Sequence, residues 1–110
     1  MPRPLLEETA LDAVSALNTA RTYGPADGCK AEGFLCVVTF GAGTNAGVVL
    51  IEGAADPTFA GTWATLATIT WAAASRAHET FIAGSFIARR VRISTGVTGG
   101  TVSAKVLITG

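Results

Sequence analysis

The sequence predicts an all-β protein, a sandwich or barrel of about eight short strands. Segments rich in β-branched and aromatic residues alternate with short turns that contain glycine, at the regular spacing typical of such folds. The strand–helix–strand rhythm of a parallel α/β sheet is missing from the pattern. With 110 residues and no linker-like stretch, the chain is expected to form one domain.

The strongest expected strand is 34–40, FLCVVTF, which the turn GAGTNAG follows. The next strand, 47–53, is almost entirely apolar, so we expect it to be central or buried on both faces. Residues 72–79, AAASRAHE, are too short for a stable isolated helix and are expected to form a loop with at most one helical turn. The expected strands, in order, are 13–17, 20–23, 34–40, 47–53, 63–71, 80–83, 86–94 and 101–109.

The first ten residues are expected to form an extended N-terminal arm, and residues 11–110 the single β-sandwich domain. Pro2 and Pro4 favour extended backbone at and just before their own positions. Ten residues cannot make a core alone. The arm is therefore expected to lie against the flank of its own domain or against a neighbouring chain.

Composition limits the classes of partner. Apolar residues make up 49% of the chain and charged residues only 15%, so some apolar surface is expected to meet a partner subunit. Eight basic and eight acidic residues cancel, which argues against nucleic-acid binding through counterion release. A membrane partner is not expected either, because the sequence has no long apolar span and no basic amphipathic helix. The segment MPRPLLEETALD does not resemble a signal peptide, so we expect synthesis and folding in the cytoplasm.

No metal or other cofactor is expected. The chain has two cysteines, Cys29 and Cys36, and one histidine, His78, whereas a structural zinc site needs four protein ligands. A disulfide between Cys29 and Cys36 is conceivable, but in a reducing compartment free buried thiols are favoured. His78 stands near Arg76 and Glu79 without a triad motif and is expected to be a solvated surface residue.

Glu52 and Asp56 are the one candidate pair of catalytic acids. Two carboxylates on a loop could serve a glycan hydrolase. Asp56 is followed by Pro57, however, and this dipeptide starts turns, so the favoured interpretation is a strand end followed by a turn. The GAGTNAG stretch lacks the lysine of a phosphate loop and precedes a strand, which favours a hairpin turn. We therefore expect no enzymatic activity.

Two further features could form a binding surface. Trp63 and Trp71 stand at the two ends of one expected strand, which suggests either a core or interface role or a platform that stacks sugars. Arg90 and Arg92 share a face of the strand 86–94. They are expected to be solvated or to pair with acids across a subunit boundary.

Three stretches together resemble one protein family: VVLIEGAADPTFAGTW (48–63), FIAGSFIARRVRI (81–93) and VTGGTVSAKVLI (97–108). These stretches contain four features in a fixed order: an apolar strand that ends in an acid, a loop that ends in Gly-Thr-Trp, an Arg-x-Arg strand and a Gly-Gly-Thr turn. The order is similar to that of small jelly-roll proteins of tailed bacteriophage virions, among them capsid decoration (cement) proteins. The resemblance implies a jelly-roll sandwich and brings no catalytic signature with it.

The resemblance implies a structural role in the virion. Proteins of this family are typically homotrimers that bind the major capsid protein on the exterior of the capsid, often through an N-terminal arm. By position and composition, the arm here is Met1–Ala10, with Leu5 and Leu6 as apolar anchors. A carbohydrate- or receptor-binding jelly-roll module of a head or tail fibre is the alternative. The residues expected to bind the capsid or a neighbouring subunit are Pro2, Arg3, Pro4, Leu5, Leu6, Arg90 and Arg92.

Overall fold

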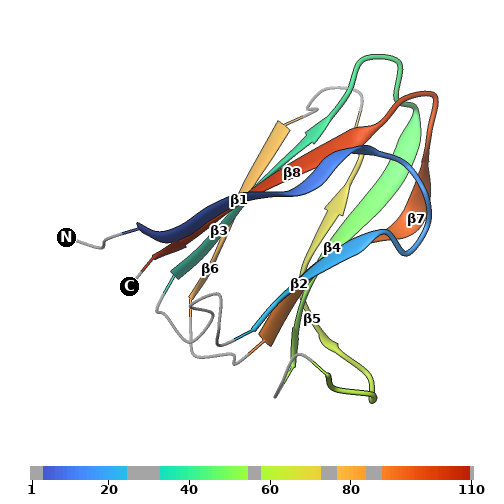
Figure 1. The fold of residues 1–110 in the computed structure, drawn as a ribbon. Helices are drawn as coiled ribbons and strands as arrows, with labels where there is room; N and C mark the ends of the chain where they lie inside the picture. The colour runs from blue at the N-terminus through green and yellow to red at the C-terminus, as the bar shows by residue number, and fades with distance from the viewer. Residues whose placement is uncertain (1–3, 25–32, 55–57, 73–76, 84–87, 110) are drawn as a thin grey trace.

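The computed structural model of the chain describes residues 4–24, 33–54, 58–72, 77–83 and 88–109, with backbone alone for 4–6, 83 and 109. These residues form an all-β fold of two antiparallel sheets with four strands each (Figure 1). The strands are β1 (Pro4–Val14), β2 (Ala20–Tyr23), β3 (Gly33–Phe40), β4 (Ala46–Ala54), β5 (Ala64–Thr70), β6 (Ala77–Ala83), β7 (Ala88–Thr98) and β8 (Val102–Thr109). The expected antiparallel β-sandwich is confirmed.

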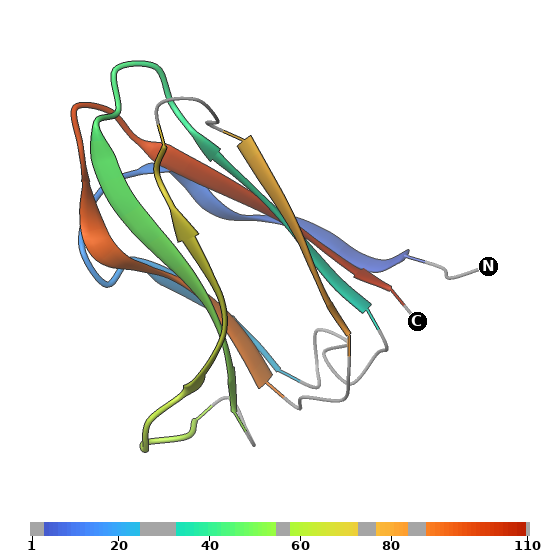
Figure 2. The ribbon, with the colours of Figure 1, turned by 180° about the vertical axis from the view of Figure 1, so that it is seen from behind.

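The two sheets are the layers of the sandwich. One sheet has the strand order β1-β8-β3-β6, which we call the first sheet, and the other has the order β2-β7-β4-β5, the second sheet. Figures 1 and 2 show the two layers from opposite sides, with the described ends of the chain together at one end of the first sheet. The strand pairs β1–β8, β2–β7, β3–β6 and β4–β5 are all antiparallel and nest inside one another along the chain.

Alternation of apolar residues builds the core between the layers. β3 places Phe34, Cys36, Val38 and Phe40 inward, and each is almost completely buried. β8 aligns with β3 in register and contributes Val102, Ala104, Val106 and Ile108. The second sheet completes the core with Val49 and Ile51 of β4 and with Val91 and Ile93 of β7. β4 is central, as expected, because it lies between β5 and β7.

The first strand differs from the expectation. The expected strand at 13–17 is replaced by β1, Pro4–Val14, which pairs with β8 from Pro4 opposite Thr109 to Val14 opposite Val102. Residues 4–10 of the expected arm are therefore extended and lie along the flank of their own domain. The reason is backbone pairing: β8 offers an open edge, and the polar residues of this segment do not prevent it from joining a sheet.

Two other strands are longer than expected. β6 begins at Ala77, so residues 77–79, the last three of the segment expected to be a loop, belong to a strand that pairs with β3. Pairing with a strong strand overrides the helical propensity of this composition. β7 continues to Thr98, although the strand was expected to end, and a turn to begin, at residue 94.

The two glycine-rich turns pack against each other. Gly43 and Gly99 have φ values of 87° and 80°, in the left-handed region that suits glycine. A Cβ on Gly43 would lie 2.8 Å from the carbonyl oxygen of Gly99, so neither turn tolerates a side chain there. Thr98 and Asn45 also hydrogen-bond across this contact. GAGTNAG is therefore a turn between β3 and β4, as expected.

Candidate functional site

A buried carboxylate lies on the outer face of the second sheet. Glu52 belongs to β4, where Ile51 points into the core and Glu52 points the other way. Although it faces outward, Glu52 is only 4% exposed. It is directly opposite Arg90 of β7 in the register of the two strands, and Arg92 is opposite Leu50. The strand pairing thus brings one acid between two bases.

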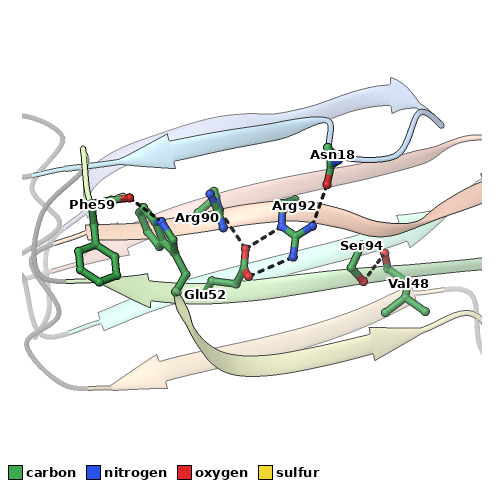
Figure 3. Close-up of polar contacts among 8 residues, drawn as sticks. Asn18, Val48, Glu52, Phe59, Arg90, Arg92 and Ser94 are labelled. Atoms are coloured by element: carbon green, nitrogen blue, oxygen red, sulfur yellow. Dashed lines mark hydrogen bonds and ion pairs between the residues drawn. The ribbon is translucent and has the colours of Figure 1, made fainter. Parts of the chain in front are cut away.

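Both arginines bind this carboxylate (Figure 3). Arg90 donates from Nε to Oε1 of Glu52 at 2.9 Å. Arg92 donates from Nε to Oε1 at 3.0 Å and from Nη2 to Oε2 at 3.2 Å, which is a bidentate contact. The two arginine side chains are only about a quarter exposed, at 24% and 23%. We call Glu52, Arg90 and Arg92 the Glu52 cluster.

The charges of the cluster support one another. Burial alone would raise the pKa of Glu52, but the hydrogen bonds from Arg92 and Arg90 outweigh it and hold the pKa below its usual range. The hydrogen bond to Glu52 in turn raises the pKa of Arg92. The cluster carries one net positive charge, because two guanidinium groups share a single carboxylate.

Neighbouring residues fix the two arginines. The Trp63 ring lies over Arg90, with the guanidinium carbon 4.4 Å from the ring centroid, a cation–π contact. Trp63 is 8% exposed, and its Nε1 donates to the carbonyl oxygen of Phe59 at 3.3 Å, which closes the loop that precedes β5. On the other side, Nη1 of Arg92 donates to Oδ1 of Asn18 at 2.9 Å. Trp63 therefore holds Arg90 in place at one end of the cluster, and Asn18 holds Arg92 at the other.

A second acid–base group lies at the sandwich edge formed by β1 and β2. Arg21 donates from Nε to Oε1 of Glu8 at 2.7 Å and from Nη2 to Oε2 at 3.3 Å. The Tyr23 hydroxyl donates to the same Oε1 at 3.4 Å. Burial, and then the Glu8 charge, raise the pKa of Tyr23. This group joins the first sheet to the second, and the sequence analysis did not identify it.

The Glu52 cluster is not arranged for acid–base catalysis. A carboxylate that accepts three charge-assisted hydrogen bonds and has a lowered pKa is a poor proton donor and a poor free base at neutral pH. Asp56, the other member of the expected acid pair, lies outside the described residues. Glu52 lies two residues before the end of β4, as expected for the end of a strand, and its carboxylate is held by β7.

Metal-binding and redox groups are sparse in the described part of the chain. The described residues contain no group of three or more His, Cys, Asp and Glu side chains that could hold a metal ion. Cys36 is a free, buried thiol whose pKa is raised to about 12 by burial, while Cys29 lies outside the described residues. His78 is half-buried, with its ring 6.3 Å from that of Phe40; the expectation of a solvated histidine is only partly met.

The residues expected to bind partners fall into separate places. Pro2 and Arg3 lie outside the described residues. Pro4, Leu5 and Leu6 lie in β1, where only their backbone is described. Arg90 and Arg92 are brought together as expected, but their first partner is Glu52 of their own chain. One signal in the sequence could have indicated this pairing: Glu52 ends an apolar run, and its negative charge complements the Arg-x-Arg pair that begins 38 residues later at Arg90.

The two tryptophans do not form a platform of exposed rings. Trp63 covers Arg90 on the outer face of the second sheet. Trp71 is half-buried and packs against the core. A β-bulge between Ile51 and Glu52 shifts the register of β5, so the alternation expected along 63–71 is interrupted. The Trp63 ring, covered by Arg90, does not offer the open face that stacking on a sugar requires.

No family model, curated protein or solved structure matches this chain. Within the described residues, no helix is long and apolar enough to cross a membrane.

Proposed function

We propose that the protein is a structural bacteriophage virion protein, a capsid decoration protein that binds the outer capsid surface as a homotrimer. The observation that carries the proposal is the order of the strands. Rolling one long hairpin into two layers produces nested antiparallel pairs and the strand orders β1-β8-β3-β6 and β2-β7-β4-β5, which are the orders found here. This supports a jelly-roll path, which is common in viral capsid proteins.

The side chains favour a scaffold over an enzyme. Two ion-paired groups join strands: Glu52 joins β4 to β7, and Glu8 joins β1 to β2. Such pairs fix the relative positions of strands, and the Glu52 carboxylate, held by two guanidinium groups, is not free to act as a general base. A shell-stabilising protein needs a rigid body with contact surfaces and requires no chemistry.

The N-terminal segment would supply one contact with the major capsid protein. In the structure its residues from Pro4 onward belong to β1, the outermost strand of the first sheet. The gripping segment of this proposal is therefore the edge strand with the residues that precede it, Pro2 and Arg3. An edge strand can add a strand of a partner through its backbone. Three such contacts in a trimer would act together, and linked contacts can exceed a single affinity by ~10²–10⁴-fold.

Arg90 and Arg92 would supply a second contact. Their guanidinium groups are about a quarter exposed after binding Glu52, and the cluster retains one net positive charge. An acidic group on a neighbouring subunit would meet donors that are already oriented. The alternative, a carbohydrate-binding module, receives less support because the Trp63 ring is covered by Arg90.

Locating the chain in virus particles tests this proposal. An antibody to the purified chain would be used on density-gradient fractions of phage particles from the source culture, and labelled particles would be imaged by electron cryomicroscopy. We expect the chain to co-sediment with full capsids and to appear on the capsid exterior at three-fold positions. If the chain is absent from washed particles, the proposed function is wrong.

A further inference from the structure

The outer face of the first sheet carries an uncovered apolar surface. Strand register places Leu107, Leu35 and Phe81 in one row across β8, β3 and β6. The next row is Lys105, Val37 and Glu79 on the same three strands. Phe81 is 60% exposed, the largest value among the exposed large hydrophobic residues described. Figures 1 and 2 show that the described strands leave this side of the layer open.

A projection and a depression lie side by side on this face. The depression has a volume of about 170 Å³ and is lined by Glu7, Leu35, Val37, Lys105, Val106 and Leu107. It lies over β8 and β3, whereas the exposed Phe81 ring is on β6, the strand at the free edge. A cavity of ~150 Å³ with apolar walls holds a benzene molecule, so the depression is large enough for a phenylalanine ring.

The charged residues of this face are also divided between the side that carries Phe81 and the side that carries the depression. Lys105 lies beside the depression and is 62% exposed, in a surface ion pair with Glu7 at 3.0 Å. Glu79 is exposed on β6, next to Phe81 along the outer face. One end of the face therefore combines an aromatic projection with an acid, and the other combines a depression with the ion pair of Lys105 and Glu7. A face of this kind is complementary to itself when it is turned around.

We propose that this face binds a second copy of the chain through a two-fold axis parallel to β3. Such an axis places β6 of one copy against β8 of the other. Phe81 of each copy then enters the depression of its partner beside Leu107, and Glu79 meets Lys105. Leu35 and Val37, which lie near the axis, contact the same residues of the second copy. A two-fold axis satisfies both halves of the contact at once.

The size of the face sets the expected affinity. The three overlapping strands, about 4.8 Å apart and roughly 25 Å long, cover ~360 Å² per copy, which is the size of a weak, transient interface. The dimer is therefore expected to form in the micromolar range. The inference does not depend on the virion role, because Phe81, Leu35 and Leu107 take no part in the proposed capsid contacts. A chain that also trimerises would form hexamers.

Sedimentation of the full chain between ~1 and ~200 µM tests the proposal, a range chosen for a small interface. We expect wild-type protein to form dimers, or hexamers, as concentration rises. Phe81→Ser should weaken this association at least ~10-fold, because it removes the aromatic side chain that enters the partner's depression. Phe59→Ser is the matched control, since Phe59 is 39% exposed on a loop of the other sheet. Circular dichroism and urea unfolding would establish that both variants are folded.

Charge reversal tests the pairing itself. Glu79→Lys and Lys105→Glu should each weaken association, and an equal mixture of the two variants should associate more strongly than either alone, because opposite charges then meet at both contacts. A wild-type chain that is only monomeric or only trimeric overturns the inference, as does a Phe81→Ser variant that associates normally. If the chain is absent from virus particles but still forms dimers, only the proposed function is overturned.

Discussion

At the scale of single residues, Glu52 decides the structure of the outer face of the second sheet. Its removal would leave Arg90 and Arg92 as two adjacent positive charges, partly buried and without their acceptor. Glu52→Gln keeps the shape but loses the charge. We expect it to lower the free energy of unfolding by about 2 kcal/mol, the usual worth of hydrogen bonds to charged groups, adjusted for partial exposure.

Urea unfolding at pH 7 measures this effect. The control is Asp12→Asn, because Asp12 is exposed and lies outside the proposed dimer contact, and a surface substitution of this kind changes stability by less than ~0.5 kcal/mol. Equal stability of the two variants would contradict the role assigned to Glu52.

The same residue predicts a pH dependence. The pKa of Glu52 is lower in the folded chain than in the unfolded chain, where it is about 4.3. Its contribution to stability is thus fully present above pH ~4.3 and is lost as the pH falls through the lowered folded pKa. The difference in unfolding free energy between wild type and Glu52→Gln should be constant from pH 7 to 5 and shrink below pH ~4.3. A constant difference down to pH 3 would contradict this.

Cys36 is the second residue with a measurable consequence. Its thiol is fully buried in the core and has a pKa raised to about 12, so it should be protonated and inaccessible at pH 8. In a Cys29→Ser background, we expect almost no reaction with an aromatic disulfide reagent in buffer and complete reaction in denaturant. Rapid reaction of the native protein, at a rate independent of its unfolding, would show that the thiol is open to solvent.

At the scale of elements, β1 has the largest consequence. If residues 1–10 were an arm separate from the sandwich, deleting them would leave the fold intact. In the structure this deletion removes the pairing of β1 with β8 from Pro4 to Thr9 and the ion pair between Glu8 and Arg21. We expect a loss of about 3 kcal/mol or more in unfolding free energy, since several ladder hydrogen bonds of ~1 kcal/mol each are broken.

A shorter deletion, of residues 1–3, is the control for this experiment and should leave the unfolding midpoint almost unchanged. Equal midpoints for the two deletions would show that residues 4–10 do not contribute to the sandwich. The comparison also matters for capsid binding, because only the shorter deletion tests a gripping segment without disturbing the fold.

The elements also show what could be predicted from the sequence. The strands with strong alternation, such as β3 and β8, were predicted to within one residue because one face of each is buried. β1 was missed because Pro2 and Pro4 suggested an arm and because Glu8 faces inward to Arg21, which breaks the apolar alternation. β6 was shortened because its first residues favour helix locally, while pairing with β3 decides their conformation.

The candidate site was predictable only in part. Alternation along β7 placed Arg90 and Arg92 on one face, and the structure agrees. Their shared partner depends on the register of β4 against β7, and no local pattern fixes the register of strands so far apart in sequence. The apolar surface expected from the low charge content is present at Phe81, but its position depends on the sheet order.

At the scale of the whole molecule, the nested pairing predicts how the chain folds. β4 and β5 are neighbours in sequence, whereas β1 and β8 join the two ends of the described chain, with Pro4 opposite Thr109. Closing the larger loops is unfavourable until the inner pairs exist. We therefore expect slow folding, in milliseconds to seconds, as in other proteins dominated by distant pairs, with the β4–β5 pair formed early.

Two matched substitutions test this order. Ile51 of β4 and Ile108 of β8 are both completely buried, and Ile→Val at either should cost ~0.5–1.5 kcal/mol. In stopped-flow measurements, Ile51→Val should mainly slow refolding, because its contacts exist in the transition state. Ile108→Val should mainly accelerate unfolding, because β8 gains its last neighbour, β1, late. Refolding faster than a millisecond, or equal slowing by the two substitutions, would show that the sandwich does not form outward from its inner hairpin.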